Sequence, residues 1–296
     1  MLDLKKKYLS FIKKQEIFGE YFYDKINQLN KFYLPLCNEL FKKYRLKKKP
    51  LIVGLSGGQG SGKSTISKIL QIILEVKFKL NVVCFSIDDF YKTASERKKM
   101  SKSIHSLFRT RGVPGTHDYK MLTNVFNYLT RKKFKTIRIP KFDKAIDDRS
   151  KVRYWQTIKK KPDIIIFEGW CVGARPQSIK ELKKPLNSLE KEEDTNLTWR
   201  KKVNNELRTN YKKIYKLLDK KIYLKVPSFG YVLKWRLLQE KKLRMKLNKK
   251  KSMNNKEVKR FVMFYERITR KMVKDYKNND VIMFIDKKHK IGSIKF

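Results

Sequence analysis

Cysteine is scarce in this chain of 296 residues, and its few cysteines indicate neither a disulfide framework nor a zinc site. Cys37, Cys84 and Cys171 are odd in number, far apart in the sequence and without a C-x-x-C pair. This use of cysteine fits a reducing compartment, where structural disulfides are rare. We therefore expect a cytoplasmic protein.

Long hydrophobic runs are also absent, so the sequence predicts no membrane-spanning segment. The first residues include Asp3, Glu16 and Glu20 among lysines, and they contain no apolar core of signal-peptide length. We expect a soluble, unprocessed protein without a membrane partner.

Acidic residues are few: 28 aspartates and glutamates stand against 74 lysines and arginines, which gives a formal charge of +46. Such a charge suggests either a nucleic-acid partner or a lysine-rich solvated surface without one. Only 16 of the basic residues are arginine, and the lysines are spread along the whole chain. Because nucleic-acid recognition relies more on arginine and aromatic platforms, we expect no specific nucleic-acid partner. The oligomeric state stays open.

The phosphate-binding pattern G-x-x-x-x-G-K-[ST] is the strongest motif in the sequence. It lies between a short apolar run, residues 51–55, and a segment of helical periodicity, residues 63–76. A glycine turn that binds nothing is the alternative, which these flanking elements disfavour. The pattern predicts binding of ATP and Mg²⁺, with Lys63 on the β and γ phosphates and Ser64 on the metal. The expected nucleotide-binding residues are Gly57, Gly58, Gln59, Gly60, Ser61, Gly62, Lys63, Ser64 and Thr65.

Short apolar runs separated by helices predict an α/β fold of three layers with a mostly parallel sheet, as in P-loop NTPases. The candidate strands are residues 51–55, 82–87, 136–139, 163–167, 221–226 and 281–285. We expect a kinase-like domain over residues 47–296. Because ligands of such sheets bind beyond the carboxyl ends of the strands, the residues after each run are the candidates for function.

Residues 1–46 precede this pattern and are expected to form a helical extension packed on the core. Their apolar residues recur mostly at steps of three and four. An aromatic stripe of this kind is usually core rather than a binding surface. The residues are Leu4, Tyr8, Phe11, Ile12, Phe18, Tyr21, Phe22, Ile26, Leu36, Leu40 and Phe41.

Two acidic positions follow strands. Asp88 and Asp89 come after residues 82–87, where a carboxylate could accept a proton from an attacking alcohol and help to hold Mg²⁺. Aspartate also caps helices and turns, and we expect Asp88 to serve chemistry and Asp89 to be the more plausible cap. Glu168 follows residues 163–167 in the position of a Walker B acid, which predicts that it helps to hold Mg²⁺ through a bound water or orients the substrate.

Charged loops lie between and after these strands. Each charge alone is more often a solvated surface residue, and a lone loop histidine is more often structural than catalytic. Together they could bind the carboxylate of a small anionic substrate. The candidate substrate-binding residues are Arg111, His117, Asp118, Lys144, Arg149 and Arg175.

A helical lid is expected at about residues 229–255. The sequence predicts a basic helix over residues 231–244 and a second helix over residues 255–276. In phosphoryl-transfer enzymes such a lid brings arginines onto the phosphates and excludes water, and Arg236 and Arg244 could do so here. A solvated basic helix is an equally good interpretation.

Residues 57–65, 86–91, 111–118, 140–149 and 167–176 together resemble the plant and cyanobacterial type of D-glycerate 3-kinase. That family is similar in turn to the phosphoribulokinase, uridine kinase and pantothenate kinase group. The resemblance implies transfer of the ATP γ-phosphoryl group to the 3-hydroxyl of D-glycerate, and it makes the first aspartate of Asp88-Asp89-Phe90-Tyr91 the base.

The resemblance extends from about residue 50 to the C-terminus, but the lid departs from it with a lysine-rich stretch at residues 246–251. Two alternatives stay open: a kinase for another hydroxyl acceptor (a nucleoside, a sugar phosphate or a pantothenate-like compound), and a nucleotide-dependent nucleic-acid-binding protein.

Overall fold

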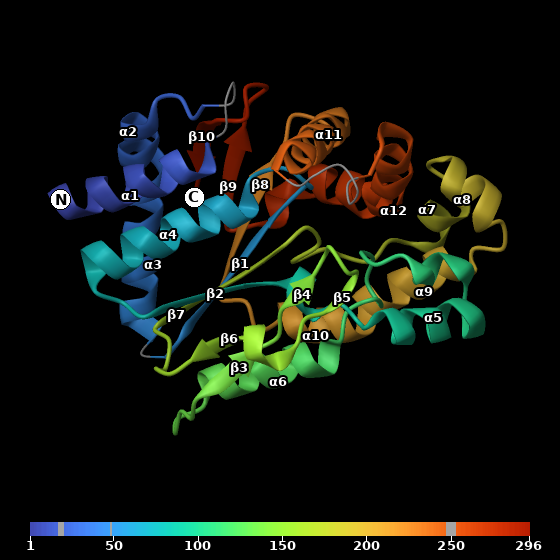
Figure 1. Ribbon diagram of the computed structural model, residues 1–296, viewed down its shortest axis with the longest axis horizontal. Coiled ribbons are helices and arrows are strands. Elements are labelled where there is room, and N and C mark those ends of the chain that lie inside the picture. Colours follow the sequence, from blue (N-terminus) through green and yellow to red (C-terminus); the bar gives the residue numbers. More distant parts are fainter. Residues whose placement is uncertain (17–20, 48, 247–252) are drawn as a thin grey trace.

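A six-stranded sheet forms the centre of the protein in the computed structural model, which describes residues 1–16, 21–47, 49–246 and 253–296, without the side chains of residues 242–246 (Figure 1). Its strand order is β10-β9-β8-β1-β7-β2. All neighbouring pairs are parallel except β9 and β10. The strands are β1 (Leu51–Gly57), β2 (Val82–Ser86), β7 (Ile164–Gly169), β8 (Lys220–Lys225), β9 (Val281–Ile285) and β10 (Ile291–Lys295).

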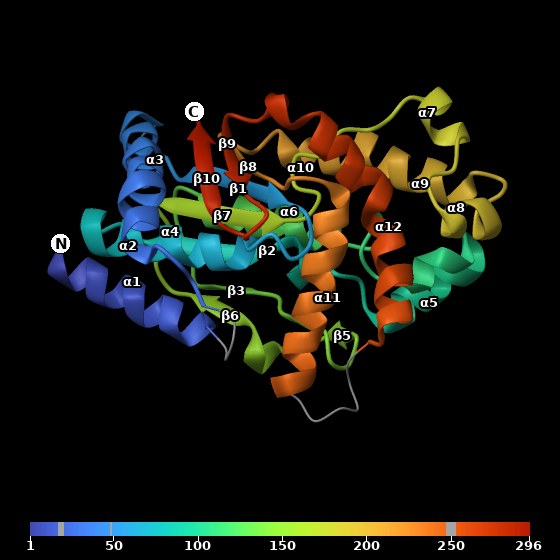
Figure 2. The ribbon, with the colours of Figure 1, turned by 90° about the horizontal axis from the view of Figure 1, so that it is seen from above.

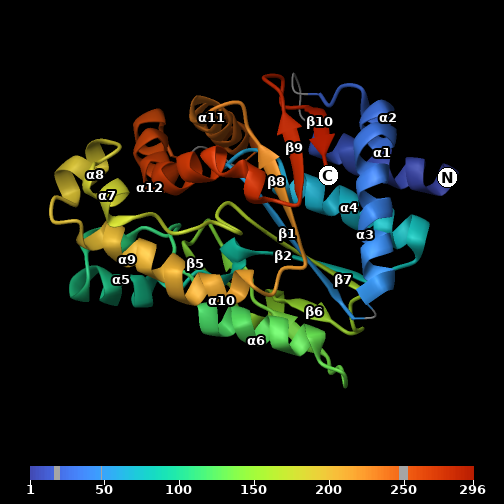
Figure 3. The same ribbon diagram turned by 180° about the vertical axis from the view of Figure 1, so that it is seen from behind.

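Helices cover both faces of this sheet, which confirms the predicted three-layer α/β fold (Figures 1 and 3). Residues of β1 alternate between the two faces: Val53 joins the core under α1 (Leu2–Gln15), α3 (Leu34–Lys47) and α4 (Lys63–Phe78), whereas Ile52 joins the opposite core. That opposite core contains residues of α6 (Tyr119–Thr130), α9 (Thr198–Glu206) and α12 (Asn255–Lys274). Every residue of β1 is buried, as expected for a strand covered on both sides.

Shorter elements complete the described chain. The remaining helices are α2 (Lys25–Gln28), α5 (Ala94–Ser103), α7 (Ile179–Lys183), α8 (Ser188–Glu193), α10 (Lys212–Tyr215) and α11 (Phe229–Lys246). Two π-helical turns (Leu29–Tyr33 and Leu207–Tyr211) and four 3₁₀ turns (Ile87–Phe90, Ser106–Arg109, Val152–Tyr154 and Tyr276–Asn278) also occur. Two small antiparallel pairs lie outside the main sheet: β3 (Ile137–Ile139) with β6 (Gln156–Ile158), and β4 (Phe142–Asp143) with β5 (Asp148–Arg149). No described helix has the length and apolar character that a bilayer crossing requires.

One predicted strand is not in the main sheet, and one strand of that sheet was not predicted. Residues 136–139 supply β3, which pairs antiparallel with β6 instead of extending the parallel sheet. Only Ile139 of this strand is buried, so the run is too short and too exposed for the sheet interior. The strand that was not predicted, β10, is antiparallel and forms the sheet edge beside β9, although most of its residues are exposed.

The N-terminal helices are tied to the sheet by polar contacts. The Tyr44 hydroxyl donates a hydrogen bond to Asp163, and the Lys47 ammonium pairs with Asp219, both just before strands of the sheet. The side-chain amide of Gln28 donates to the carbonyl of Ile291 (2.9 Å) and accepts from its N–H (3.2 Å), so it satisfies backbone groups of edge strand β10.

Burial in this extension is uneven. Leu4, Tyr8, Ile12, Leu36 and Leu40 are in the core, as expected. Phe11 and Phe41 are half-buried, whereas Tyr21, Phe22 and Ile26 are exposed, so the expectation of packing is wrong for these three. Phe18 lies outside the described residues.

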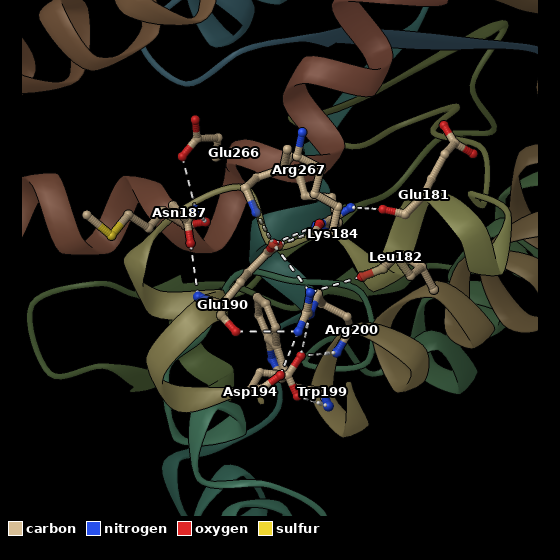
Figure 4. A network of polar contacts seen from close by, with 12 residues as sticks. Glu181, Leu182, Lys184, Asn187, Glu190, Asp194, Trp199, Arg200, Glu266 and Arg267 are labelled. Carbon is tan, nitrogen blue, oxygen red and sulfur yellow. Dashed lines mark hydrogen bonds and ion pairs between the residues drawn. The ribbon is translucent and has the colours of Figure 1, made fainter. Parts of the chain in front are cut away.

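The two helices predicted at residues 231–244 and 255–276 are α11 and α12, which lie beside each other over the carboxyl side of the sheet (Figure 2). A buried ion network holds α12 to α8 (Figure 4). The Arg267 guanidinium donates to both carboxylate oxygens of Glu190 (2.7 and 2.6 Å) and also to the carbonyls of Glu181 and Lys184. Glu190 is fully buried, and besides Arg267 it accepts from the Leu186 N–H (2.8 Å) and lies 4.0 Å from the Arg200 guanidinium.

We expect Arg267→Met to lower the free energy of unfolding by about 3–5 kcal/mol, because the variant leaves the buried Glu190 carboxylate without its bidentate partner. Arg260→Met is the matched control on the same helix, since Arg260 pairs with Glu193 of α8 at the surface. That change should cost less than about 1 kcal/mol. Urea denaturation measures both, and equal losses would show that burial does not govern the contribution of these pairs.

Candidate active site

Three neighbouring strands end at the candidate site. In the parallel register Glu168 of β7 lies opposite Leu55 of β1 on one side and Ser86 of β2 on the other. The phosphate-binding loop follows β1, and Asp88 lies in the 3₁₀ turn Ile87–Phe90 that directly follows β2. The sheet topology therefore brings Lys63, Ser64, Asp88 and Glu168 to one edge, as ligand sites of open α/β sheets require.

The phosphate-binding loop has the backbone shape that its glycines allow. Gly60 has a φ of +73° and a Cβ there would stand 2.9 Å from Cβ of Trp235 in α11, so both conformation and space require glycine. Gln59 Oε1 and Ser61 Oγ are buried and have no hydrogen-bond partner among the described residues. Buried polar atoms without partners are costly, which marks this loop as incomplete without a polar ligand.

Lys63 and Ser64 begin α4, and each side chain donates a hydrogen bond to an oxygen. The Lys63 ammonium donates to the carbonyl of Gly58 (3.0 Å), and burial lowers the pKa of Lys63 against the opposing charges of Glu168 and Asp88. The Ser64 hydroxyl donates to Glu168 Oε1 (2.7 Å). Burial raises the pKa of Glu168, although Lys63 and the Ser64 hydroxyl act in the other direction.

Asp88 and Asp89 have different partners. Asp89 accepts from the Ser86 N–H (3.2 Å) in a capping box and pairs with Lys141 (2.9 Å). Asp88 accepts from the Lys144 ammonium (2.6 Å) and from the Tyr91 hydroxyl (3.0 Å). Burial would raise the pKa of Asp88, but the charge and hydrogen bond of Lys144 outweigh it and hold that pKa well below its usual range.

Three of the candidate substrate-binding residues are engaged in fixing loops. Arg111 pairs with Asp147, which lies in the turn between β4 and β5, and stacks over the Phe142 ring. Arg149 donates to the carbonyl of Tyr91 (3.2 Å) and pairs with Asp118 (3.5 Å). Asp118 caps α6. Lys144 is the candidate whose cation contacts the Asp88 carboxylate directly.

His117 is buried beside Asp88. Its ring stacks on Tyr91 (centroids 4.5 Å apart), and its Nδ1 lies 2.6 Å from the Tyr211 hydroxyl. That hydroxyl also accepts from the N–H of Gly115 (3.1 Å), so its own proton is available to His117 Nδ1. Burial lowers the pKa of His117 to about 3, which keeps the ring neutral near pH 7.

The remaining candidates are Arg175, Arg236 and Arg244. Arg175 is exposed and lines a cavity with Lys221 and Asn279, at the amino ends of β8 and β9, so the structure does not bring it to the phosphate loop. Arg236 pairs with Glu240 (2.6 Å) one helical turn away and lies over the Phe261 ring. Arg244 belongs to α11, but its side chain lies outside the described part of the chain.

Tyr91 and Tyr265 complete the site, and neither was among the predicted site residues. Tyr91 follows Asp88 by one 3₁₀ turn, and its place in the Asp-Asp-Phe-Tyr motif could have predicted it as a site residue. Tyr265 comes from α12 and donates to the carbonyl of Arg111 (3.3 Å). A Cβ at Gly112, whose φ is +141°, would collide with the Tyr265 hydroxyl. Such a long-range contact leaves no local sequence signal.

The donor set fits a magnesium nucleotide. Ser64, Glu168 and Asp88 offer oxygens, the ligands that Mg²⁺ prefers. Within the described ranges no cluster of three or more histidine, cysteine or acidic residues could hold a metal by itself. A site with few protein ligands is what Mg²⁺ uses when substrate phosphates supply the others.

Comparison with known proteins finds that this chain is similar to kinases. A profile of the phosphoribulokinase / uridine kinase family matches residues 52–210. An uncharacterized kinase, mug58, of Schizosaccharomyces pombe is 35% identical over 225 residues, which cover 73% of this chain and 79% of that protein. The chloroplastic D-glycerate 3-kinase of Arabidopsis thaliana is 28% identical over 224 residues, covering 73% of this chain but only 46% of that longer protein.

A solved structure has the same fold. The D-glycerate 3-kinase of Cryptococcus neoformans superposes with a TM-score of 0.75 and 23% sequence identity. The match covers 89% of this chain and 98% of the other. At this level of identity the likeness concerns the fold.

The buried His117 predicts a defined response to acid. Because its folded pKa of about 3 lies below the unfolded value near 6.5, the unfolded state binds more protons between those values, and stability falls as the pH falls through that window. We expect His117→Gln to remove about 2 kcal/mol of the loss that the wild type suffers between pH 6.5 and 4.5. Urea denaturation at several pH values measures the difference. Parallel curves for the two proteins would show that His117 does not titrate in this way.

Proposed function

This chain belongs to the phosphoribulokinase / uridine kinase family, and we propose that it transfers the γ-phosphoryl group of ATP to the 3-hydroxyl of D-glycerate, giving 3-phosphoglycerate. A P-loop kinase for a small molecule is the activity that membership indicates. The choice of acceptor is supported by the motifs at residues 111–118 and 140–149 and by the two D-glycerate 3-kinases to which the chain is similar.

One observation carries the proposal: a Ser64–Glu168 pair and an Asp88–Lys144 pair meet at the ends of three neighbouring strands. The first pair has the composition of a magnesium site, and the second joins a proton acceptor to a cation. A kinase for an anionic alcohol needs both, because it must organise the phosphates and deprotonate a hydroxyl.

On the nucleotide side, Lys63 and the backbone N–H groups of residues 57–65 would bind the triphosphate. Ser64, Glu168 and Asp88 would hold Mg²⁺, which when bound neutralises charge on the phosphates that develops during transfer. Burial lowers the pKa of Lys63, and the negative charge of a bound nucleotide would act in the other direction, so nucleotide binding would favour the charged form of Lys63.

On the acceptor side, Asp88 would accept the proton of the 3-hydroxyl. Lys144 would contact the carboxylate of glycerate, with His117, Arg111 and Arg149 forming the surrounding wall. Arg111 and Arg149 act mainly through the loops they hold, because each already has a carboxylate partner. Arg236 of α11 would approach the phosphates and help to exclude water.

In a panel of D-glycerate, nucleosides, sugar phosphates, pantothenate and RNA, D-glycerate should be the compound that stimulates ATP consumption. Asp88→Asn should lower the glycerate-dependent rate by about 10²- to 10⁴-fold, because the amide cannot accept the proton. Labelled ATP with product separation measures the transfer.

Asp89→Asn is the matched control: its carboxylate caps the turn after β2, so the variant should keep most of the activity. Lys63→Met should lose turnover with every acceptor. Stimulation by RNA with little effect of glycerate would overturn the proposal, as would full activity of Asp88→Asn.

A further inference from the structure

Both oxygens of the Asp88 carboxylate are occupied by groups of the protein itself. Oδ1 accepts from the Tyr91 hydroxyl (3.0 Å), and Oδ2 accepts from the Lys144 ammonium (2.6 Å). The two partners differ in exposure. Tyr91 is fully buried, whereas 59% of the Lys144 side chain is exposed. Lys144 is therefore the partner that can leave without disturbing the core.

The hairpin that carries Lys144 is fixed on both sides of it. Asp147, with a φ of +55°, is held by Arg97 (2.9 Å) and by Arg111. On the other side the N–H and hydroxyl of Ser150 donate to the carbonyl of Lys141 (2.8 and 2.7 Å). Because the base of the hairpin is held, only the four-carbon stem of Lys144 needs to turn for its ammonium to change partner.

The Lys144 ammonium is paired with the Asp88 carboxylate in this structure. An incoming carboxylate would compete with Asp88 for this ammonium.

We propose that Lys144 is a switch that keeps Asp88 from acting as a base until an anionic acceptor takes its ammonium away. The inference rests on the proposed function, in which Asp88 is the base and the acceptor carries a carboxylate. When the acceptor carboxylate binds Lys144, Asp88 Oδ2 is free to receive the hydroxyl proton.

In the transfer step the acceptor oxygen forms a bond to the γ-phosphorus, and the bond from that phosphorus to the β–γ bridging oxygen breaks. ADP leaves with the bonding pair, and the hydroxyl proton moves to Asp88. Water could undergo the same exchange to give inorganic phosphate. It carries no carboxylate, so it does not displace Lys144, and Asp88 stays paired. The switch thus suppresses hydrolysis of ATP in the absence of acceptor.

Lys144→Met and Lys141→Met form a matched pair for the test. The two lysines are 59% and 58% exposed in their side chains, come from the same hairpin and pair with the adjacent residues Asp88 and Asp89. Acceptor-free ATP hydrolysis in the full-length protein should rise about tenfold or more in Lys144→Met. In Lys141→Met it should stay within about twofold of the wild type. The KM for D-glycerate should rise in Lys144→Met alone.

Two further variants exclude trivial explanations. Adding Asp88→Asn to Lys144→Met should return hydrolysis to the wild-type level or below, because the freed base is then gone. Lys144→Arg keeps the charge and should keep hydrolysis low. Unchanged hydrolysis in Lys144→Met, or an equal rise in Lys141→Met, would overturn the switch. Failure of the wild type to phosphorylate glycerate would instead reject the proposed substrate, while the hydrolysis comparison still decides the role of Lys144.

Discussion

Glu168 is buried and the Asp88 side chain is only 26% exposed, so the hydrogen-bond donors and cations beside these two carboxylates favour their charged forms. The parallel register of β1, β7 and β2 brings the two carboxylates to one sheet edge, where Ser64 contacts the first and Lys144 and Tyr91 contact the second. Ser64, Lys144 and Tyr91 thus supply the polar partners of the two carboxylates within the protein. In the proposed reaction, nucleotide, metal or acceptor would engage the same groups.

A second set of buried charges lies in the helical layer beside the charged loops. Glu190 and Arg267 fasten α12 to α8, and α12 in turn presents Tyr265 to the carbonyl of Arg111. Arg111 then holds Asp147 in the turn of the hairpin that carries Lys144. A series of contacts thus joins the helical layer to the hairpin beside Asp88. Because each buried member would be costly to leave unpaired, the arrangement is specific as well as stable.

Local motifs made much of the fold and the centre of the site predictable. The phosphate loop requires a strand before it and a helix after it, and five of the six predicted strands lie in the main sheet. Pairing partners far apart in sequence were not predictable. Residues 136–139 form a separate antiparallel pair, and β10 joins the edge through contacts with β9 and Gln28.

The same distinction applies to the side chains around Asp88. Charge and position after a strand identified Lys144, Arg111, Arg149 and Asp118, but not which of them already had partners. The structure pairs Arg149 with Asp118 and Arg111 with Asp147, and leaves Lys144 on Asp88. Tyr211, which approaches His117 from the end of a π-helical turn, is 94 residues away in the sequence and gave no local signal.

A crystal structure with a non-hydrolysable ATP analogue, Mg²⁺ and D-glycerate tests the central claim most directly. The account predicts the terminal phosphate beside Lys63, the metal on the Ser64 hydroxyl, the glycerate 3-hydroxyl hydrogen-bonded to Asp88, and the Lys144 ammonium on the glycerate carboxylate. Asp88 and Glu168 turned away from the terminal phosphorus, with no space beside it for a three-carbon acid, would contradict it.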